Sequence, residues 1–535
     1  MVVVGSGFTG AMAAQTLLEN SCRVLMLDIG LKPAETSASP QQNFLKIRTE
    51  NSMQYKLWLG KNFEAVANIR SISTPRFTPL RSYVLEGASK LLPVISESFN
   101  TVQSLSYGGL GGAWNLGAHM YSDSELKQVG LPPSIKIAYQ AIADRIGLSA
   151  GQDDALPYTL QGLNNIQEPV KIDANSRSIY QKYLNKKKLI NSRGFMLGKP
   201  SLALLTDRKG IRQSVAYDEM EFYSNQGDSA YRPAVTIEQL QKNPSFRYVP
   251  HALLLSFSED GEYTVADYFD IASGERRTLK CKKLFLCTGA LSTARIVLRS
   301  MGGQREVKLP LLSDTQKFFT LIQPSVLGMN DTEPRTALAQ LMLFHDPDGS
   351  NSAVSAASIY SYRTLMMFRI MKDIPLNFRE GRMLLQYFLP AISIMDVHHP
   401  DANSPVKFVE LISSPASISK DALKIAYALT PEEQKNIRKR EAKFSATMRA
   451  MGCYTLRKTD PGFGSGGHYA GCLPFSAYKR DFHLHPSGRI YGTKNVYVAD
   501  GSGFRYLPAK DPSLTLMANA HQVALNAILE SYPVY

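Results

Sequence analysis

The sequence predicts an α/β protein in which a parallel-sheet domain is assembled from separated segments and a second, α+β domain carries its own sheet. Two observations predict this fold. An apolar run at residues 1–4 leads through a glycine turn into a helical pattern at 8–19 and a second apolar run at 23–27, which is a β-α-β unit. At residues 283–298 another buried strand leads through a turn into a helical pattern, as expected for a further crossing of the same sheet.

The remaining segments differ in pattern along the chain. Residues 246–300 alternate like a β-meander, whereas 316–412 are apolar and aromatic with few glycines, which is typical of an inserted domain. A helix is predicted at 431–451, a strand at 495–498 and a closing helix at about 513–530. Because 535 residues exceed what one hydrophobic core supports, two or more domains are expected.

The composition excludes some classes of protein. Hydrophobic residues make up 44% and charged residues 20%, which is ordinary for a globular chain and excludes general disorder. The net charge of +14 fits an anionic substrate or cofactor, an anionic membrane surface, or solubility alone. Nucleic acid is not expected as a partner, because no basic cluster is interleaved with aromatic residues.

Cysteine usage and apolar runs bear on location. The five cysteines lie far apart with no CxxC pair, which favours buried thiols in a reducing, cytoplasmic compartment. The first glycine turn begins at Gly5 and leaves no room for a signal peptide, unless residues are missing upstream. No run of about 20 apolar residues predicts a transmembrane helix. Residues 360–374 mix apolar and basic side chains, so contact with a membrane surface or a lipid-linked substrate is one interpretation and a core helix is the other.

The glycine turn after the first strand has the spacing of a dinucleotide site. Gly5 permits the tight turn, Gly7 lets the backbone approach a pyrophosphate, and Gly10 allows close packing of helix and strand. The helix N-terminus faces the anion. Asp28 ends the next strand, where a carboxylate accepts ribose hydroxyls. FAD and NAD both fit this segment, and a glycine turn with no ligand is the remaining alternative.

Three further motifs carry candidate functional residues. Residues 107–115 hold four glycines within five positions next to a tryptophan, which indicates backbone close to a flat or bulky group rather than a flexible surface loop. His468 lies in a glycine-flanked loop, where a histidine is usually only solvated. Asp511 and Pro512 are a good helix start, with aspartate as the cap and proline at the first helical position.

Taken in order, these motifs resemble the glucose-methanol-choline (GMC) oxidoreductase family. The set comprises the turn at 5–10 with Asp28, the loop at 108–114, the turn at 288–290, the His468 loop and the pair at 500–501, which together bracket nearly the whole chain. The segments at roughly 130–245 and 301–460 are placed by position alone. The sequence is most similar to bacterial members associated with sugar and surface-glycan metabolism and to the pyranose oxidase branch.

The resemblance implies an FAD-dependent enzyme that oxidises an alcohol group, with a sugar or glycoside as the expected substrate. His468 would accept the hydroxyl proton while hydride passes to flavin N5, and Asp511 occupies the second catalytic position. The family usually has His or Asn there, so an anion at Asp511 would oppose reduced flavin unless it is protonated or paired with Lys510. Ala113 stands where some members attach FAD covalently, which implies non-covalent FAD.

The resemblance also implies the cofactor-binding residues and the domains. The residues expected to bind FAD are Gly5, Gly7, Phe8, Thr9, Gly10, Asp28, Gly109, Gly111, Gly112, Trp114, Asn115, Ala252, Gly289, Asp500, Gly501, Pro512 and Ser513. The expected domains are the FAD-binding domain (1–130, 246–300 and 466–535), a substrate-domain insertion or cap (131–245) and the substrate-binding domain (301–465).

Other functions are weighed against this one. A flavin-fold protein that has lost catalysis would explain Asp511, and a non-sugar alcohol is an alternative substrate. A metal enzyme using His398, His399, His483 and His485 is disfavoured, since adjacent residues cannot share one face of a strand or helix. A hydrolase is disfavoured because no Gly-x-Ser-x-Gly occurs. The sequence does not identify the electron acceptor or the oligomeric state.

Overall fold

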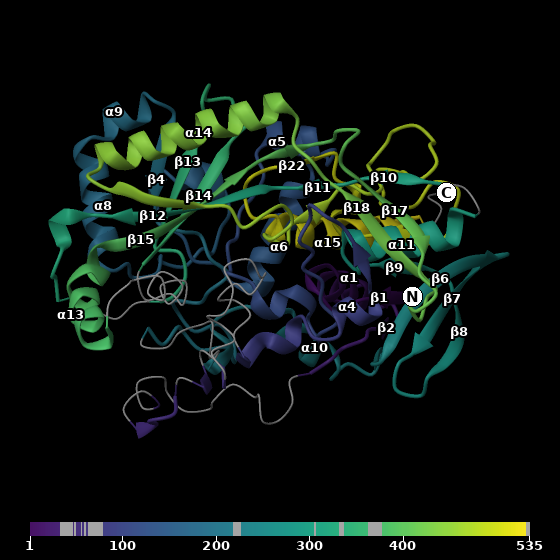
Figure 1. Ribbon diagram of the computed structural model, residues 1–535. Helices are drawn as coiled ribbons and strands as arrows, with labels where there is room; N and C mark the ends of the chain where they lie inside the picture. The colour runs from purple at the N-terminus through teal and green to yellow at the C-terminus, as the bar shows by residue number, and fades with distance from the viewer. Residues whose placement is uncertain are drawn as a thin grey trace.

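The computed structural model places two sheets at opposite ends of the molecule (Figure 1). It describes residues 1–32, 47, 50–54, 56–57, 60–61, 79–217, 226–303, 306–330, 336–361 and 377–530. In Figure 1 the parallel sheet and its helices lie at the right, and a six-stranded sheet lies at the left with a long helix drawn above it. The expected α/β class is confirmed.

The parallel sheet is built from strands that are far apart in the sequence. Its order is β21 (Val496–Val498), β9 (Leu284–Leu286), β1 (Val2–Val4), β2 (Val24–Leu27) and β5 (Phe246–Val249). All four pairings are parallel. The three central strands read VVV, VLML and LFL and are almost entirely buried, as expected for a sheet covered on both faces.

Helices cover this sheet. Helix α1 (Phe8–Glu19) packs against α15 (Ser513–Leu529) and α10 (Pro233–Leu240), and α15 also packs against α6 (Ile135–Ile146). Helix α11 (Ala290–Met301) lies against β6 (Ala252–Asp260), the first strand of a meander that continues through β7 (Tyr263–Asp270) and β8 (Glu275–Cys281). The meander predicted from residues 246–300 is therefore confirmed.

The six-stranded sheet is antiparallel and has its own core. Its order is β19 (Tyr454–Thr459), β12 (Thr315–Ile322), β15 (Ile392–His399), β14 (Ser355–Ser361), β13 (Leu341–His345) and β4 (Phe195–Gly198). Helices α14 (Pro431–Ala450), α8 (Ala174–Asn185) and α9 (Lys187–Asn191) pack on it, so that Phe319, Leu343 and Phe444 share one buried cluster. The helix predicted at 431–451 is confirmed.

Short pairings tie the two parts together. Strand β11 (Leu312–Ser313) leads directly into β12 and pairs with β20 (Tyr469–Ala470), which follows His468. Strand β16 (Asp401–Ala402) pairs with β22 (Tyr506–Leu507). A four-stranded sheet, with β10 (Lys308–Pro310), β17 (Phe408–Ser413), β18 (Asp421–Ala426) and β3 (Val94–Ile95), lies beside α11. The β11–β20 pair brings the start of β12, in the six-stranded sheet, to the His468 loop.

The predicted domain boundaries stay a prediction. Within residues 131–245, α6 and α10 pack on helices of the parallel-sheet part while β4 joins the six-stranded sheet. Of the segment at 360–374, residues 362–374 lie outside the described residues, so its membrane interpretation also stays a prediction. Among the described residues, no helix combines the length and apolar character that crossing a bilayer requires.

Candidate functional site

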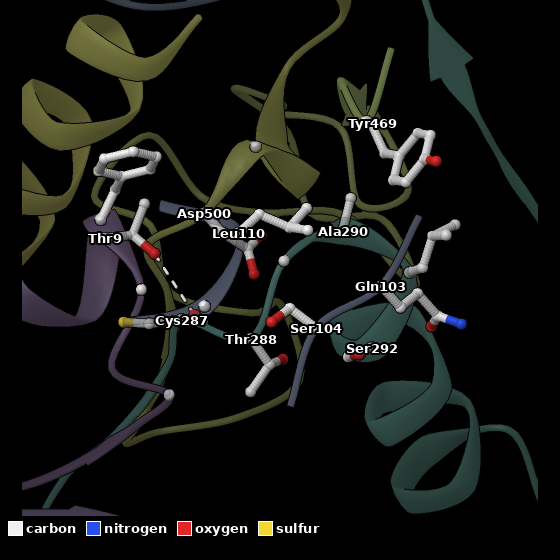
Figure 2. A pocket seen from close by; sticks show the side chains of 18 of the residues that line it. Thr9, Gln103, Ser104, Leu110, Cys287, Thr288, Ala290, Ser292, Tyr469 and Asp500 are labelled. Carbon is white, nitrogen blue, oxygen red and sulfur yellow. Dashed lines mark hydrogen bonds between the residues drawn. The ribbon is translucent and has the colours of Figure 1, made fainter. Parts of the chain in front are cut away.

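A long pocket runs along the carboxyl ends of β1, β2 and β9, where open parallel sheets bind their ligands. Figure 2 shows Thr9 on α1, Cys287 and Thr288 after β9, and Asp500 after β21 around one space. Ser104 lines this space from the segment before the glycine-rich loop, and Leu110 lines it from within that loop. The strands that are distant in sequence therefore build one binding site.

The turn between β1 and α1 leaves room for an anion. A Cβ on Gly5, whose φ is +96°, would lie 2.7 Å from the Cys287 carbonyl oxygen, and one on Gly10 would lie 1.8 Å from the Gly5 oxygen. At Gly7, by contrast, no heavy atom of the described residues lies within 4 Å of that position. Gly7 caps α1 without a side-chain partner, and the first turn of α1 has no acidic residue. This exposed helix N-terminus suits a phosphate.

Asp28 is buried at the pocket wall and held by two hydroxyl groups. The Ser6 hydroxyl donates to Asp28 Oδ2, as does the Tyr248 hydroxyl at 2.8 Å. The backbone N–H of Gly108 donates to Ser6 Oγ at 2.9 Å, which connects this turn to the glycine-rich loop. Burial raises the pKa of Asp28 to about 6, even though the Ser6 and Tyr248 bonds favour its charged form.

The second crossing repeats this open geometry. Gly289, with φ +80°, caps α11, and no heavy atom of the described residues lies within 4 Å of its Cβ position. Asp500 does not point a free carboxylate at the pocket: Oδ2 accepts from Thr293 Oγ1 at 2.6 Å and Oδ1 accepts from Ser502 N at 2.9 Å. Asp500 therefore fixes the turn after β21 to the start of α11.

The glycine-rich loop lies on the start of α1. It forms a 3-10 turn, η4 (Gly109–Ala113), and a Cβ on Gly109 would come within 3.3 Å of the Gly7 Cα. Trp114 follows, packs edge-on against Phe8 at 4.7 Å between ring centroids, and donates from Nε1 to Asp511 Oδ2 at 3.2 Å. These contacts give the close backbone approach that the sequence predicted for this loop.

Most of the residues expected to bind a cofactor line this one pocket. The exceptions are Gly10, which packs on Gly5, Gly112, which lies against Val84, and Asn115, whose Nδ2 is 3.5 Å from the Tyr360 hydroxyl. The lining residues among those expected are Gly5, Gly7, Phe8, Thr9, Asp28, Gly109, Gly111, Trp114, Ala252, Gly289, Asp500, Gly501, Pro512 and Ser513. Their individual roles stay predictions.

His468 lines the same pocket, as do Pro512 and Ser513. Its side chain is 19% exposed, and Nδ1 lies 3.1 Å from Asp314 Oδ2. Burial lowers the pKa of His468, but the charge of Asp314 and its hydrogen bond outweigh that, so the pKa is raised above its ordinary value. The histidine is therefore held beside a carboxylate rather than merely solvated.

Sequence reasoning did not find the carboxylate–histidine pair behind His468. Asp314 Oδ2 also lies 2.5 Å from His398 Nδ1, and His398 Nε2 lies 3.3 Å from Asp396 Oδ2. Asp396 and His398 share one face of β15, because residues two apart do so on any strand. Gln316, directly opposite His398 on β12, donates to Asp396 at 2.7 Å.

Asp511 has both carboxylate oxygens engaged. Oδ1 accepts from the N–H of Ser513, the first residue of α15, at 2.9 Å, and Oδ2 accepts from Trp114 Nε1. Lys510 does not neutralise Asp511 as the sequence suggested. It pairs instead with Glu125 of α5 (Asp123–Val129) at 2.7 Å, and both side chains are 1% exposed.

His119 is a second functional candidate that the sequence reasoning missed. Its Nδ1 accepts from the backbone N–H of Asp511 at 3.1 Å, which assigns the proton to Nε2. Nε2 is buried and has no hydrogen-bond partner among the described residues. Burial lowers the pKa of His119 to about 4, so the ring is neutral at physiological pH.

The four histidines considered as a metal set are not brought together. His399 contacts Ser355 on the face of β15 opposite to His398, and His483 and His485 bond within their own loop. A different trio, Asp314, His398 and His468, offers ligand atoms that all lie within 4.8 Å of one another. The four histidines, which the sequence analysis disfavoured as a metal set, therefore do not meet at one site.

Known proteins share part of this sequence and the overall fold. Residues 406–520 match the family model described as GMC oxidoreductase. This stretch lies in the C-terminal part of the chain and agrees with the family resemblance of the sequence motifs. The fold also matches a crystal structure of pyridoxine 4-oxidase from Mesorbium loti, with a TM-score of 0.56 and 14% identity over 98% of each chain. No curated protein was found to match the sequence.

These comparisons support the α/β architecture and the resemblance to GMC oxidoreductases. The fold matches a Rossmann-like parallel-sheet domain joined to a second part with its own six-stranded antiparallel sheet. Members of the GMC oxidoreductase family are flavin-dependent oxidoreductases that act on alcohols. The resemblance recognised in the sequence is confirmed.

Proposed function

We propose that the chain binds FAD non-covalently and oxidises the CH–OH group of a small polar alcohol, with His468 as the proton acceptor. One observation carries the proposal: His468 lines the same continuous pocket as the turn at Gly5–Gly10 and Asp28. A dinucleotide that begins at Asp28 and passes the N-terminus of α1 would occupy the pocket that His468 lines, where a base is needed.

The residues present suit each part of FAD. The Asp28 carboxylate, held at one oxygen, would accept the adenosine ribose hydroxyls. The open space at Gly7 and at Gly289 would admit the pyrophosphate between two helix N-termini. The Ala113 side chain lines the pocket and has no atom able to form a covalent bond to flavin. These residues support non-covalent binding.

His468 is set up to act as a base. When bound, FAD supplies the acceptor for the hydride that leaves the alcohol carbon. Because Asp314 Oδ2 accepts from His468 Nδ1, the neutral ring keeps the lone pair of Nε2 for the hydroxyl proton. Asp511, with both oxygens engaged, would position Trp114 and the start of α15 rather than take the proton.

Two substrate classes are distinguished by experiment. The sequence resemblance favours a sugar or glycoside, whereas the name of the similar structure, pyridoxine 4-oxidase, favours a heteroaromatic alcohol such as pyridoxine. We propose the sugar or glycoside and include pyridoxine and simple aliphatic alcohols as competing candidates. Oxygen and artificial quinone acceptors would be compared once a substrate is found.

The test is anaerobic bleaching of the flavin. Acid precipitation of one sample of FAD-loaded protein should release the flavin into the supernatant. In a second, native sample kept free of oxygen, a sugar or glycoside should bleach the flavin. Flavin that stays in the pellet would contradict non-covalent binding. Failure to retain any flavin after reconstitution, or bleaching by none of the alcohols, would overturn the proposed function.

A further inference from the structure

Both ring nitrogens of His398 face carboxylates. Nδ1 lies 2.5 Å from Asp314 Oδ2 and Nε2 lies 3.3 Å from Asp396 Oδ2. An ionised carboxylate only accepts hydrogen bonds, so the ring satisfies both partners only if both nitrogens carry protons. Burial lowers the pKa of His398, but Asp396 and Asp314 together raise it well above its ordinary value. His398 is therefore an imidazolium cation.

The same oxygen of Asp314 serves both histidines. Oδ2 lies within hydrogen-bond distance of His398 Nδ1 and of His468 Nδ1, while Oδ1 is buried without a partner among the described residues. Asp314 is 1% exposed on its side chain, so water does not screen it. The carboxylate thus links a fixed cation to the proposed base.

The charges around His468 come from four parts of the chain. Asp314 precedes β12, His398 and Asp396 lie on β15, Asp511 precedes α15, and neutral His119 comes from the loop after η4. Asp314 and Asp511 favour protonation of His468, whereas His398 opposes it. Without the cation, the buried carboxylates would raise the pKa of His468 further, and an imidazolium cannot accept a proton.

We propose that Asp314, His398 and Asp396 are positioning residues that set the tautomer and basicity of His468. Asp314 holds the proton of His468 on Nδ1, and the His398 cation, itself held by Asp396, weakens the binding of a second proton at Nε2. This inference rests on the proposed function, in which His468 is the base. When the alcohol O–H bond breaks and its proton bonds to Nε2, while the hydride passes from the alcohol carbon to the flavin of the proposed function, the cluster of Asp314, Asp396, His398 and His468 loses its net negative charge.

The test follows histidine protonation directly in FAD-loaded protein without substrate. Protein labelled with nitrogen-15 in histidine would be titrated by long-range proton–nitrogen NMR as the parent and as Asp314→Asn, His398→Gln and His399→Gln. The His399 variant is the matched control, because it removes the adjacent imidazole on the other face of β15. Circular dichroism would check that each variant is folded.

Asp314→Asn and His398→Gln should shift the titration midpoint of His468 in opposite directions. Asp314→Asn should lower the titration midpoint of His468 by about one pH unit or more and mix its tautomers, because it removes the adjacent negative charge. His398→Gln should raise the midpoint, since glutamine can donate to Asp314 without carrying charge. The acid limb of the pH profile for flavin reduction should move in the same directions, and His399→Gln should leave both readouts in place.

Three results would overturn the inference. The first is a titration midpoint of His468 that shifts in the same direction in Asp314→Asn and His398→Gln. The second is a neutral His468 in the parent with its proton on Nε2. The third is a stoichiometric metal ion in the purified protein whose removal by a chelator alters the Asp314, His398 and His468 signals, because a metal would replace the shared protons. If no alcohol reduces the flavin, the proposed function fails, but the NMR titration still decides whether the cluster controls His468.

Discussion

Replacing Asp511 by asparagine separates its two hydrogen bonds. Both donors that face the carboxylate, Ser513 N at 2.9 Å and Trp114 Nε1 at 3.2 Å, need an acceptor. An asparagine side chain offers one accepting oxygen and one donating amide, so one donor is left unmatched in either orientation. The cap on α15 tolerates asparagine about as well as aspartate, and we therefore expect the Trp114 bond to be lost.

The expected loss can be isolated by a double-mutant cycle. A hydrogen bond to a charged group contributes about 1.5–3 kcal/mol, and partial exposure of Asp511 places this one near 1.5 kcal/mol. Urea unfolding followed by circular dichroism should show Asp511→Asn destabilised by about that amount in the parent. In a Trp114→Phe background, where the donor is absent, the same change should be nearly neutral. Equal losses in both backgrounds would refute the assignment, and no loss in either would reduce Asp511 to a helix cap.

Further predictions concern the buried ion pair and the cofactor turn. Lys510→Met should destabilise the protein by about 3–5 kcal/mol in urea unfolding, because it strands a buried carboxylate, and adding Glu125→Gln should restore most of the loss; a double variant no better than the single one would contradict this. Gly10→Ala should prevent folding, since its Cβ would lie 1.8 Å from a backbone oxygen. Gly7→Ala should fold but bind FAD more weakly, as measured by calorimetry. Equal FAD affinity of Gly7→Ala and the parent would argue against a pyrophosphate at Gly7. Because burial raises the pKa of Asp28 from 3.8 to about 6, the folded cofactor-free protein binds the proton more tightly than the unfolded chain, and its stability should fall by about 3 kcal/mol between about pH 3 and pH 7. Asp28→Asn should remove this component of the urea-unfolding profile, and an unchanged slope would contradict the assignment.

Local sequence patterns predicted the parallel-sheet part of the molecule well. The turn from Gly5 to Gly10 is informative because strand, turn and helix are contiguous, and each glycine has a separate steric reason visible in the sequence spacing. The distant strand β9 was also predictable, since its three apolar residues are followed by a turn and a helix. Contiguous signals of this kind survive folding because tertiary contacts reinforce them.

The cluster behind His468 was not predictable in the same way. Asp314 and His468 are 154 residues apart, and Asp314 and His398 are 84 apart, so only the register of β12 and β15 and the β11–β20 pair bring them together. The alternation of Asp396 and His398 on one strand face was a usable signal, but the sequence analysis weighed His398 only as part of a metal set, which it disfavoured. The Lys510–Glu125 pair was missed for the same reason, because its partner is set by packing.

The role of His468 can be measured most directly by stopped-flow flavin reduction without oxygen. The parent and His468→Gln would be loaded with FAD and mixed with the alcohol that bleaches the parent fastest. The account predicts that the variant binds FAD as tightly as the parent but is reduced about 10²- to 10⁴-fold more slowly, as expected for loss of a general base. Reduction of the variant at the rate of the parent would contradict the account, because it would show that the proton leaves the alcohol without His468.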